Sequence, residues 1–449
     1  MRERNFFFQS QLVISSRNKR PKFGRLVSRR QTRCETSSIM PAEPGTSMSK
    51  VQRRTYVYKT LHSPGDERIP VLLDIYLPPV VSNLATGDSL TLGALVYFHG
   101  GGLTVGNRMS WFPTWLQKRI TDAGHIFISP DYRLIPSGST TGHDILEDVQ
   151  DVFKFVAKLS NDVTPEQSEL DSRPVQFRVD PERIAVSGSS AGGLCAYLAA
   201  MHATPKPKAV LSMYGMGGNF LISHYYTLKQ SVFFRGREIL DPTLFSDLLH
   251  PACLSLSSQV ITGSPNTYFS PDAPTDVIAK PGLETNSGPP GFPSNRRMFL
   301  ARLYLQLGEF LNYYTGEFEP SLSASLRTKA EDMQSTSSLS DRGLEDNLAE
   351  VIPEKHRSLF PSLCSPHAYA SWPPVYFFHG SLDSAVHIRE SQRLHDLLTE
   401  AGVQSVLNIA QGMEHSFDYQ PDADAIHGQE FSKIGRWLDE FLTDTKIDS

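Results

Sequence analysis

The sequence predicts an α/β fold with a mostly parallel β-sheet and helices on both of its faces. Short apolar runs such as Ala94–Phe98 contain no charged residue, which is typical of strands buried on both sides. Most of these runs alternate with segments of helical apolar spacing. The alternation stops between about 216 and 365 and then resumes, which predicts a long insertion within one sheet domain.

The first half of the chain alternates as a parallel sheet requires. Two β-rich runs, RRTYVYKTL and IPVLLDIYLPP, begin the folded sequence, and prolines end the second. LGALVYFHGGG and HIFISPDYR have the pattern of buried strands, with a helix predicted between them in WFPTWLQKRITDAG, ending at Gly124. GHDILEDVQDVFKFVAKLS predicts an amphipathic helix whose apolar face holds Ile145, Val149, Val152, Phe153 and Val156.

The second half repeats this alternation around the insertion. RIAVSGS, AGGLCAYLAAMHA and KAVLSMYG predict a strand, a helix and a strand. PVYFFHG, HIRESQRLHDLLTEAG and VQSVLNIAQG predict the same order, and GQEFSKIGRWLDEFLTD predicts a closing helix. The insertion is rich in Pro, Gly and Ser and contains one strong helical pattern, RMFLARLYLQLGEFLNYYTG.

Composition limits the class of protein. The 449 residues are 39% hydrophobic and 20% charged, as in soluble globular proteins, and the net charge of −5 predicts no nucleic-acid partner. No window is apolar enough for a transmembrane segment. The four cysteines are scattered, which favours neither a disulfide framework nor a zinc site and indicates a reducing, cytoplasmic setting.

Residues 1–48 differ from the rest of the chain. The first 34 residues contain ten Lys or Arg and one acid. We expect a disordered basic extension, with Met40 or Met48 as alternative starts; the other interpretation is a targeting segment that sends the protein to mitochondria.

A serine lies at a predicted sharp bend in RIAVSGSSAGGLCAY. Gly188, Ser190 and Gly192 form a G-x-S-x-G motif where a strand meets a helix. Such a turn strains the central residue, lifts its hydroxyl above the sheet and leaves no room for side chains two positions away. Ser190 is therefore the candidate nucleophile, although a glycine turn after a strand is often only a turn.

A glycine run follows an earlier buried strand at His99, Gly100, Gly101 and Gly102. A carbonyl under attack becomes an oxyanion, and donors must already point at it. Consecutive glycines let backbone N–H groups approach closely, so we expect the amides of Gly101, Gly102 and Ala191 to serve as an oxyanion hole. The alternative is a flexible turn without a role.

An acid and a histidine follow the last two predicted strands. Asp383 lies in FFHGSLDSAV and His415 in GMEHSFD, so the chain order is serine, acid, histidine. His415 would accept the proton of Ser190, and Asp383 would hold its tautomer. The alternative role for Asp383 is to cap a helix that begins near Ala385. His379 is expected to be a structural residue at the strand end and not a second candidate base.

Together HGGG, G-x-S-A-G-G, DYRL at 131–134 and G-x-x-H-x-F resemble the hormone-sensitive-lipase-like branch of α/β-hydrolases, above all its fungal carboxylesterase and secondary-metabolism members. The match covers about 52–215 and 370–445. It implies an α/β-hydrolase fold and a serine hydrolase that acts on a small-molecule ester without a metal or organic cofactor. Ser189 departs from the Asp or Glu usual in this branch, as does the IPSGSTTGHD continuation after DYRL.

The resemblance also implies a division of the chain. We expect a first catalytic part at 49–215, a cap at 216–365 and a second catalytic part at 366–449, because the distance from Ser190 to Asp383 far exceeds one crossover. Such caps shape the substrate pocket. Aromatic residues of the cap are candidates for lining it, although packing is the favoured role for each alone: Phe220, Tyr225, Tyr226, Phe299, Tyr304, Tyr313 and Tyr314.

Two other functions remain open on the same residues. An acyl-enzyme can pass its acyl group to an alcohol, an amine or water, so acyl transfer or product release in a biosynthetic pathway is one alternative. A ligand receptor on the same fold is another, and the presence of His415 argues against it. The sequence does not predict an oligomeric state.

Overall fold

The computed structural model describes residues 52–62, 66–83, 89–160, 166–168, 176–258, 261–270, 292–336 and 340–444. Residues Ser49–Ser449 form a compact unit of their own. The predictions for the basic extension at 1–48 and for Cys34 lie outside the described residues.

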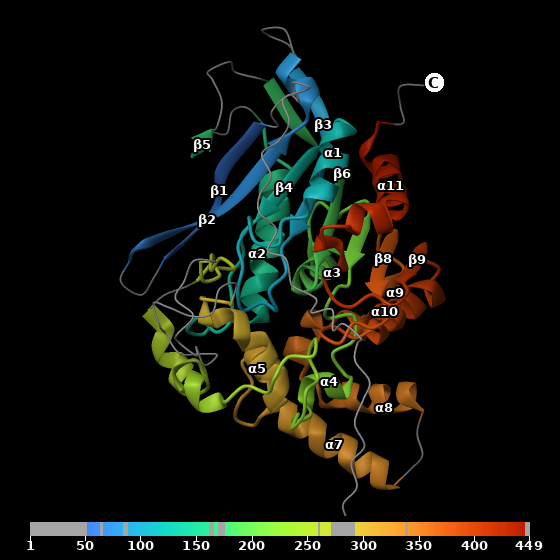
Figure 1. Cartoon of the computed structure of the whole chain (residues 1–449). Coiled ribbons are helices and arrows are strands. Elements are labelled where there is room, and N and C mark those ends of the chain that lie inside the picture. The colour runs from blue at the N-terminus through green and yellow to red at the C-terminus, as the bar shows by residue number, and fades with distance from the viewer. Residues whose placement is uncertain are drawn as a thin grey trace, which may run out of the picture. The chain divides into compact units, whose positions relative to one another are not determined.

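A nine-stranded sheet crosses the described residues in the order β5-β1-β2-β4-β3-β6-β7-β8-β9 (Figure 1). From β4 to β9 in this order every neighbouring pair is parallel, whereas β1 and β2 pair antiparallel with each other and with β5 and β4. The strands are β1 Gln52–His62, β2 Arg68–Leu77, β3 Ser89–Phe98, β4 Ile126–Pro130, β5 Gln167–Ser168, β6 Gln176–Ser189, β7 Val210–Met213, β8 Val375–Gly380 and β9 Ser405–Ala410.

Five helices cover the two faces of this sheet: α1 Thr114–Asp122, α2 Gly142–Val156, α3 Ala191–His202, α10 Ile388–Glu400 and α11 Ala423–Leu442. Alternate residues of β3 enter two separate apolar clusters, because successive side chains of a strand point to opposite faces. One cluster contains residues of α2, α3 and α10, and the other contains residues of α1 and α11. The prediction of helices on both faces is therefore confirmed.

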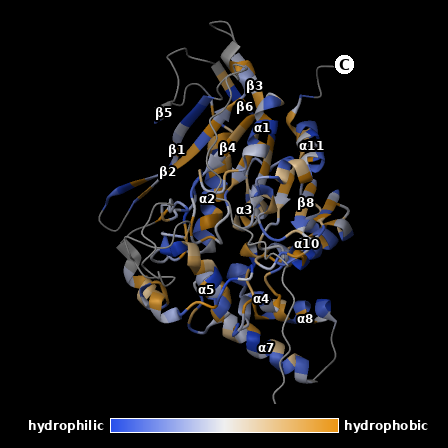
Figure 2. Ribbon diagram, in the orientation of Figure 1, coloured by the Kyte–Doolittle hydropathy of each residue, from blue (hydrophilic) through white to orange (hydrophobic). Residues whose placement is uncertain are grey.

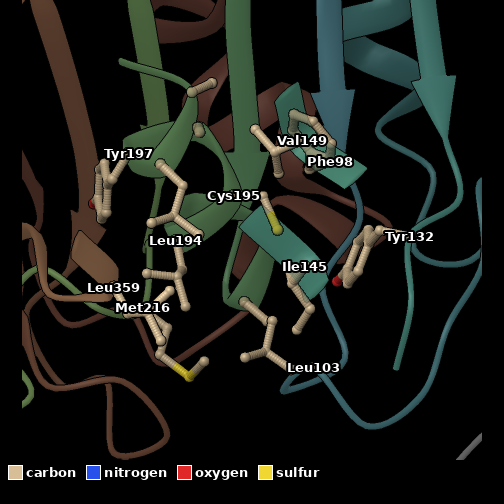
Figure 3. Packing of buried hydrophobic residues seen from close by; sticks show 14 of the residues in the cluster. Phe98, Leu103, Tyr132, Ile145, Val149, Leu194, Cys195, Tyr197, Met216 and Leu359 are labelled. Atoms are coloured by element: carbon tan, nitrogen blue, oxygen red, sulfur yellow. The ribbon is translucent and has the colours of Figure 1, made fainter. Parts of the chain in front are cut away.

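The larger cluster packs α2 and α3 against the centre of the sheet. Figure 3 shows Ile145 and Val149 of α2 close to Leu194 and Cys195 of α3, and all four side chains are fully buried. In Figure 2 the hydrophobic colour follows the central strands, and hydrophilic residues mark α8 and α10. This packing holds the N-terminal end of α3 against the sheet.

Helices α4, α5, α7 and α8, from the chain between β7 and β8, gather at one end of the sheet (Figure 1). We infer that residues 216–365 of this stretch are the predicted cap. The helices of the stretch are α4 Ser223–Tyr226, α5 Leu300–Leu307, α6 Phe310–Thr315, α7 Leu322–Thr336, α8 Asp341–Leu348 and α9 Pro366–Tyr369.

One prediction for the cap is wrong. The pattern RMFLARLYLQLGEFLNYYTG forms a short 3-10 turn at Arg296–Phe299 followed by two helices, α5 and α6, and not one continuous helix. Gly308 ends α5 in a left-handed conformation, with φ of 65°. A Cβ there would lie 2.6 Å from the backbone of Thr227. The chain at Gly308 therefore packs directly against the loop after α4, and the helix ends there.

Within the described ranges, no helix combines the length and apolar character needed to cross a bilayer. Cys195, Cys253 and Cys364 are free thiols. No group of three or more His, Cys, Asp or Glu side chains in that part of the chain is arranged to hold a metal ion.

Candidate active site

Ser190 occupies the junction between β6 and α3. Its backbone has φ of 54° and ψ of −122°, a conformation that costs free energy for any residue other than glycine. A Cβ on Gly188 would lie 1.9 Å from the carbonyl oxygen of Gly192, and a Cβ on Gly192 would lie 2.0 Å from that of Phe98. Both glycines are therefore required for the bend that presents the serine.

The structure brings Ser190, His415 and Asp383 together. Nε2 of His415 lies 3.0 Å from Oγ of Ser190, and Nδ1 of His415 lies 2.6 Å from Oδ2 of Asp383. His415 and Asp383 are each 7% exposed. Because a carboxylate accepts, Nδ1 carries the proton and Nε2 is left to accept the hydroxyl proton of Ser190.

Asp383 makes two kinds of contact. Its Oδ1 accepts hydrogen bonds from the backbone N–H groups of Ala385 and Val386 at 2.9 and 2.8 Å, so it also stabilises the turn that precedes α10. Burial by itself raises the pKa of Asp383, but the charge of His415 and the hydrogen bonds from His379 and His415 outweigh it and hold that pKa well below its usual range. His379 is fully buried and also bonds the carbonyl of Val386, which fits the structural role predicted for it.

Glu414 links the two loops that carry the acid and the histidine. Its Oε1 accepts from the N–H groups of His415 and Ser384, at 2.7 and 2.8 Å, and its Oε2 accepts from the hydroxyl of Ser384 at 2.6 Å. The ring of Tyr214 meets that of His415 edge-on at 4.7 Å, and its hydroxyl donates to Asp418. Sequence reasoning missed these supports; their one signal was a glutamate next to the histidine in GMEHSFD.

The HGGG segment lies beside the serine. Gly101 and Gly102 line the same cavity as Ser190, and Ala191 directly follows the serine at the start of α3. His99 is buried, and its Nδ1 bonds the carbonyl of Gly100 at 2.7 Å. Burial lowers the pKa of His99 to about 4, so this imidazole is neutral and structural at physiological pH.

The DYRL segment packs against the HGGG segment and holds it in place. Tyr132 donates its hydroxyl to the carbonyl of His99 at 2.9 Å and stacks on the His99 ring at 4.4 Å. Arg133 forms hydrogen bonds with the carboxylate of Asp148, which lies fully buried on α2. These contacts fix the position of the glycine run relative to α2.

Ser189, which departs from the family pattern, has its own partner. Its hydroxyl and that of Tyr97 on β3 lie 2.6 Å apart, and the Tyr97 hydroxyl also bonds that of Tyr419 at 3.2 Å. A short neutral contact thus occupies the position where the family more often has a carboxylate.

The cavity above Ser190 is lined partly by the cap. Its lining consists of Gly100, Gly101, Gly102, Val105, Trp111, Ser189, Ser190, Tyr214, Met216, Phe234, Arg235, Arg237, Tyr268, Met298, Ala301, Arg302, Leu305, Phe310, Ala385, Val386, His415, Ser416 and Tyr419. The seven cap aromatics named from the sequence as lining candidates are absent from this lining. They are all buried in the larger apolar cluster, as the packing alternative predicted.

A buried arginine fastens the cap to the glycine run. The guanidinium of Arg297 donates to the carbonyls of Thr104, Pro136 and Ile135 at 2.7, 2.9 and 3.0 Å. Further along the same segment, Ala301 packs so close to Gly102 that a Cβ on Gly102 would lie 2.2 Å from its own Cβ. The cap thereby contacts the segment that would hold the oxyanion.

A mostly parallel sheet with a serine at a strand–turn–helix junction, facing a histidine and an aspartate from later strand ends, defines the α/β-hydrolase class. Comparison with known proteins agrees. Residues 95–242 match the family described as alpha/beta hydrolase fold, and with the sheet order this confirms the α/β-hydrolase fold predicted from the sequence.

Individual relatives are partial matches. The chain is 33% identical over 123 residues to a probable carboxylesterase of Phoma sp., which covers 27% of this chain and 36% of that protein. It is 24% identical over 367 residues to a non-reducing polyketide synthase of Aspergillus calidoustus, which covers 80% of this chain and 13% of the synthase. The chain therefore spans about a third of the first relative and about an eighth of the second.

Solved structures give distant likenesses. A carboxyl esterase 2 from Tuber melanosporum has 16% identity and a TM-score of 0.45, covering 88% of this chain and 89% of its own. An alpha/beta hydrolase superfamily protein from Enterococcus faecalis has 16% identity and a TM-score of 0.47, covering 85% of this chain and 98% of its own.

Proposed function

We propose that the protein is a serine hydrolase that cleaves carboxylic esters through an acyl-enzyme on Ser190. The observation that carries the proposal is the continuous pair of contacts from Ser190 Oγ to His415 Nε2, at 3.0 Å, and from His415 Nδ1 to Asp383, at 2.6 Å. Both distances are within the range for proton transfer and for a charge-assisted hydrogen bond.

In the proposed reaction, the oxygen of Ser190 attacks the ester carbonyl carbon while Nε2 of His415 takes the hydroxyl proton. The carbonyl oxygen becomes an oxyanion that accepts hydrogen bonds from the amides of Gly101, Gly102 and Ala191. The tetrahedral adduct then expels the alcohol, which receives the proton from His415. Water attacks the acyl-enzyme by the same steps, releases the acid and returns the proton to Ser190.

Asp383 acts through the histidine. Its carboxylate keeps the proton on Nδ1 of His415 and stabilises the imidazolium that forms when Nε2 takes the serine proton. The lowered pKa of Asp383 supports this role, because the carboxylate stays ionised at neutral pH.

Replacement of the nucleophile tests the proposal. Ser190→Ala should reduce kcat for p-nitrophenyl butyrate by about 10⁶-fold, because the acyl-enzyme cannot form. Ser371→Ala, which removes a surface serine bonded to Lys206, should retain wild-type activity as the matched control. Circular dichroism would establish that both variants are folded, and substantial turnover by folded Ser190→Ala would refute the proposal.

A second candidate is acyl transfer, or release of a product from a carrier. It is supported by the likeness to polyketide synthases, which extends over 80% of this chain. The same acyl-enzyme serves water and other acceptors. Product analysis by mass spectrometry, with and without an added alcohol or amine, would separate the two: transfer predicts an acylated acceptor, and hydrolysis predicts free acid only.

A further inference from the structure

Three arginines of the cap face the same cavity as Ser190. Arg235, Arg237 and Arg302 line it, together with a small apolar group from the cap helix α5 and the turn before it. The apolar group consists of Met298, Ala301 and Leu305. The cavity that holds the reacting ester thus has a strongly cationic part, which an ordinary neutral ester does not need.

Arg302 is the most unusual of the three. Its side chain belongs to a residue only 7% exposed, and among the described residues its guanidinium has no ion pair and no hydrogen bond; its one contact of note is with the ring of Phe299, at 5.8 Å. Arg297, five residues earlier and 8% exposed, instead donates to three carbonyls. The guanidinium of Arg302 opens on the cavity, where an anion can reach it, and no described residue is its partner, so its position is better explained by a ligand than by folding.

The three positive charges also act on one another. Loss of hydration is the largest cause of the lowered pKa of both Arg237 and Arg302. The charge of Arg235 lowers the pKa of Arg237 further, and the charge of Arg237 lowers that of Arg302 further. The pKa of Arg302 falls to about 10, so it remains charged at neutral pH. Glu238 is close enough to oppose this shift, yet in the described part of the chain it forms no ion pair with Arg302. An anion in the cavity would relieve this repulsion.

The arginines are held in place relative to the reacting groups. A tight turn brings Phe234 and Arg237 together, with a 2.9 Å hydrogen bond between their backbones, and Arg235 within it has the left-handed φ of 50°. The N–H of Arg235 donates to the hydroxyl of Ser384, the residue after Asp383, at 2.8 Å. The turn is therefore fastened to the loop that carries the acid.

We propose that Arg302, Arg237 and Arg235 select esters that carry a second, anionic group, a carboxylate or a phosphate, remote from the bond that is cleaved. The proposal rests on the ester-hydrolase function proposed above and narrows its substrate class. Guanidinium groups form paired, charge-assisted hydrogen bonds with both kinds of anion. Met298, Ala301 and Leu305 would contact the apolar chain between the ester and the anion.

The test compares esters that differ in the remote group only. The p-nitrophenyl monoester of suberic acid carries a free carboxylate, its methyl diester is neutral, and an ω-phosphorylated acyl p-nitrophenyl ester carries a phosphate. The wild-type protein should show kcat/KM about 10- to 100-fold higher for one or both anionic esters than for the neutral diester. The ratio between the two anionic esters then tells which anion the site prefers.

Variants then assign this preference to the arginines. Arg302→Gln should bring the ratio of kcat/KM for the anionic ester to kcat/KM for the neutral diester close to one. Arg237→Gln, at a more exposed position, should lower the same ratio even if Arg302→Gln does not fold. Arg342→Gln is the control, because Arg342 is a cap arginine paired with Glu400 at the surface and does not line the cavity. It should keep the full preference.

The outcomes separate the two proposals. If the neutral diester is hydrolysed in a Ser190-dependent way but no anionic ester is preferred, the anion proposal is wrong and the hydrolase proposal stands. A preference that survives in both Arg302→Gln and Arg237→Gln also overturns the assignment to these side chains. If none of the three esters is cleaved, the hydrolase proposal itself fails.

Discussion

The carboxyl end of the sheet and the cap wall that faces it satisfy their polar groups in opposite ways. At the sheet, His415 and Asp383 are buried and bonded on both sides, and Glu414 joins their loops. On the cap wall, the guanidinium of Arg302 opens on the cavity and lacks a protein partner among the described residues. The difference indicates that the catalytic groups at the sheet end already have their hydrogen-bond partners before substrate binds, whereas the guanidinium on the cap wall gains its partner from a ligand.

The same contrast occurs within one segment of the cap. Arg297 donates hydrogen bonds to three backbone carbonyls and so fastens the cap to the chain next to the HGGG segment, whereas Arg302 faces the cavity. Residues of one type, five positions apart and equally buried, thus have different proposed roles. Substitutions at the two regions should therefore change different measurements.

The largest effect should come from the sheet end. Asp383→Asn keeps the shape of the side chain but no longer holds the proton on Nδ1 of His415, so kcat should fall by about 10⁴-fold. The loss should be the same for the neutral and the anionic suberate esters, measured by p-nitrophenol release. A loss confined to anionic esters would mean that the two regions are not separate in function.

A smaller effect, on stability, should separate the two cap arginines. Arg297→Met leaves three buried carbonyls without their donor and should lower the free energy of unfolding by about 3 kcal/mol. Arg302→Met removes an unpaired charge and should be neutral or stabilising. Urea unfolding followed by tryptophan fluorescence measures both, and equal losses would contradict the distinction.

The smallest effect should come from Ser189. Ser189→Ala removes its contact with Tyr97 and leaves that hydroxyl its longer bonds to Tyr419 and to the carbonyl of Trp111, both at 3.2 Å, so stability should fall by about 1 kcal/mol. Turnover of neutral esters should change less than tenfold, because the hydroxyl bonds Tyr97 and has no contact with His415. A loss as large as that of Asp383→Asn would show that Ser189 takes part in the chemistry.

Much of the sheet and of the candidate site followed from local sequence signals. Uncharged apolar runs located the central strands because a parallel sheet is buried on both faces. The glycines at 188 and 192 located Ser190 because the bend excludes any Cβ there. Strand ends located Asp383 and His415, since the carboxyl ends of parallel strands share one edge.

The cap was harder to predict because its structure depends on contacts distant in sequence. Helical periodicity continues through Gly308, and the break there arises from packing against Thr227. The aromatic residues named for the pocket fill the cap interior instead, and the cap side of the pocket is lined by three arginines, by smaller apolar side chains and by other aromatics, such as Phe234 and Phe310. Nothing local distinguishes Arg297 from Arg302, because the carbonyls that bind Arg297 lie more than 150 residues earlier in the chain.

The most direct test of the central claim is mass spectrometry of the protein after reaction with a fluorophosphonate. The proposed site predicts a single phosphonyl adduct, on the peptide that contains Ser190, formed far more slowly in a folded His415→Ala variant. An adduct on another residue, or equal labelling of wild type and His415→Ala, would contradict the assignment of Ser190 as a nucleophile activated by His415.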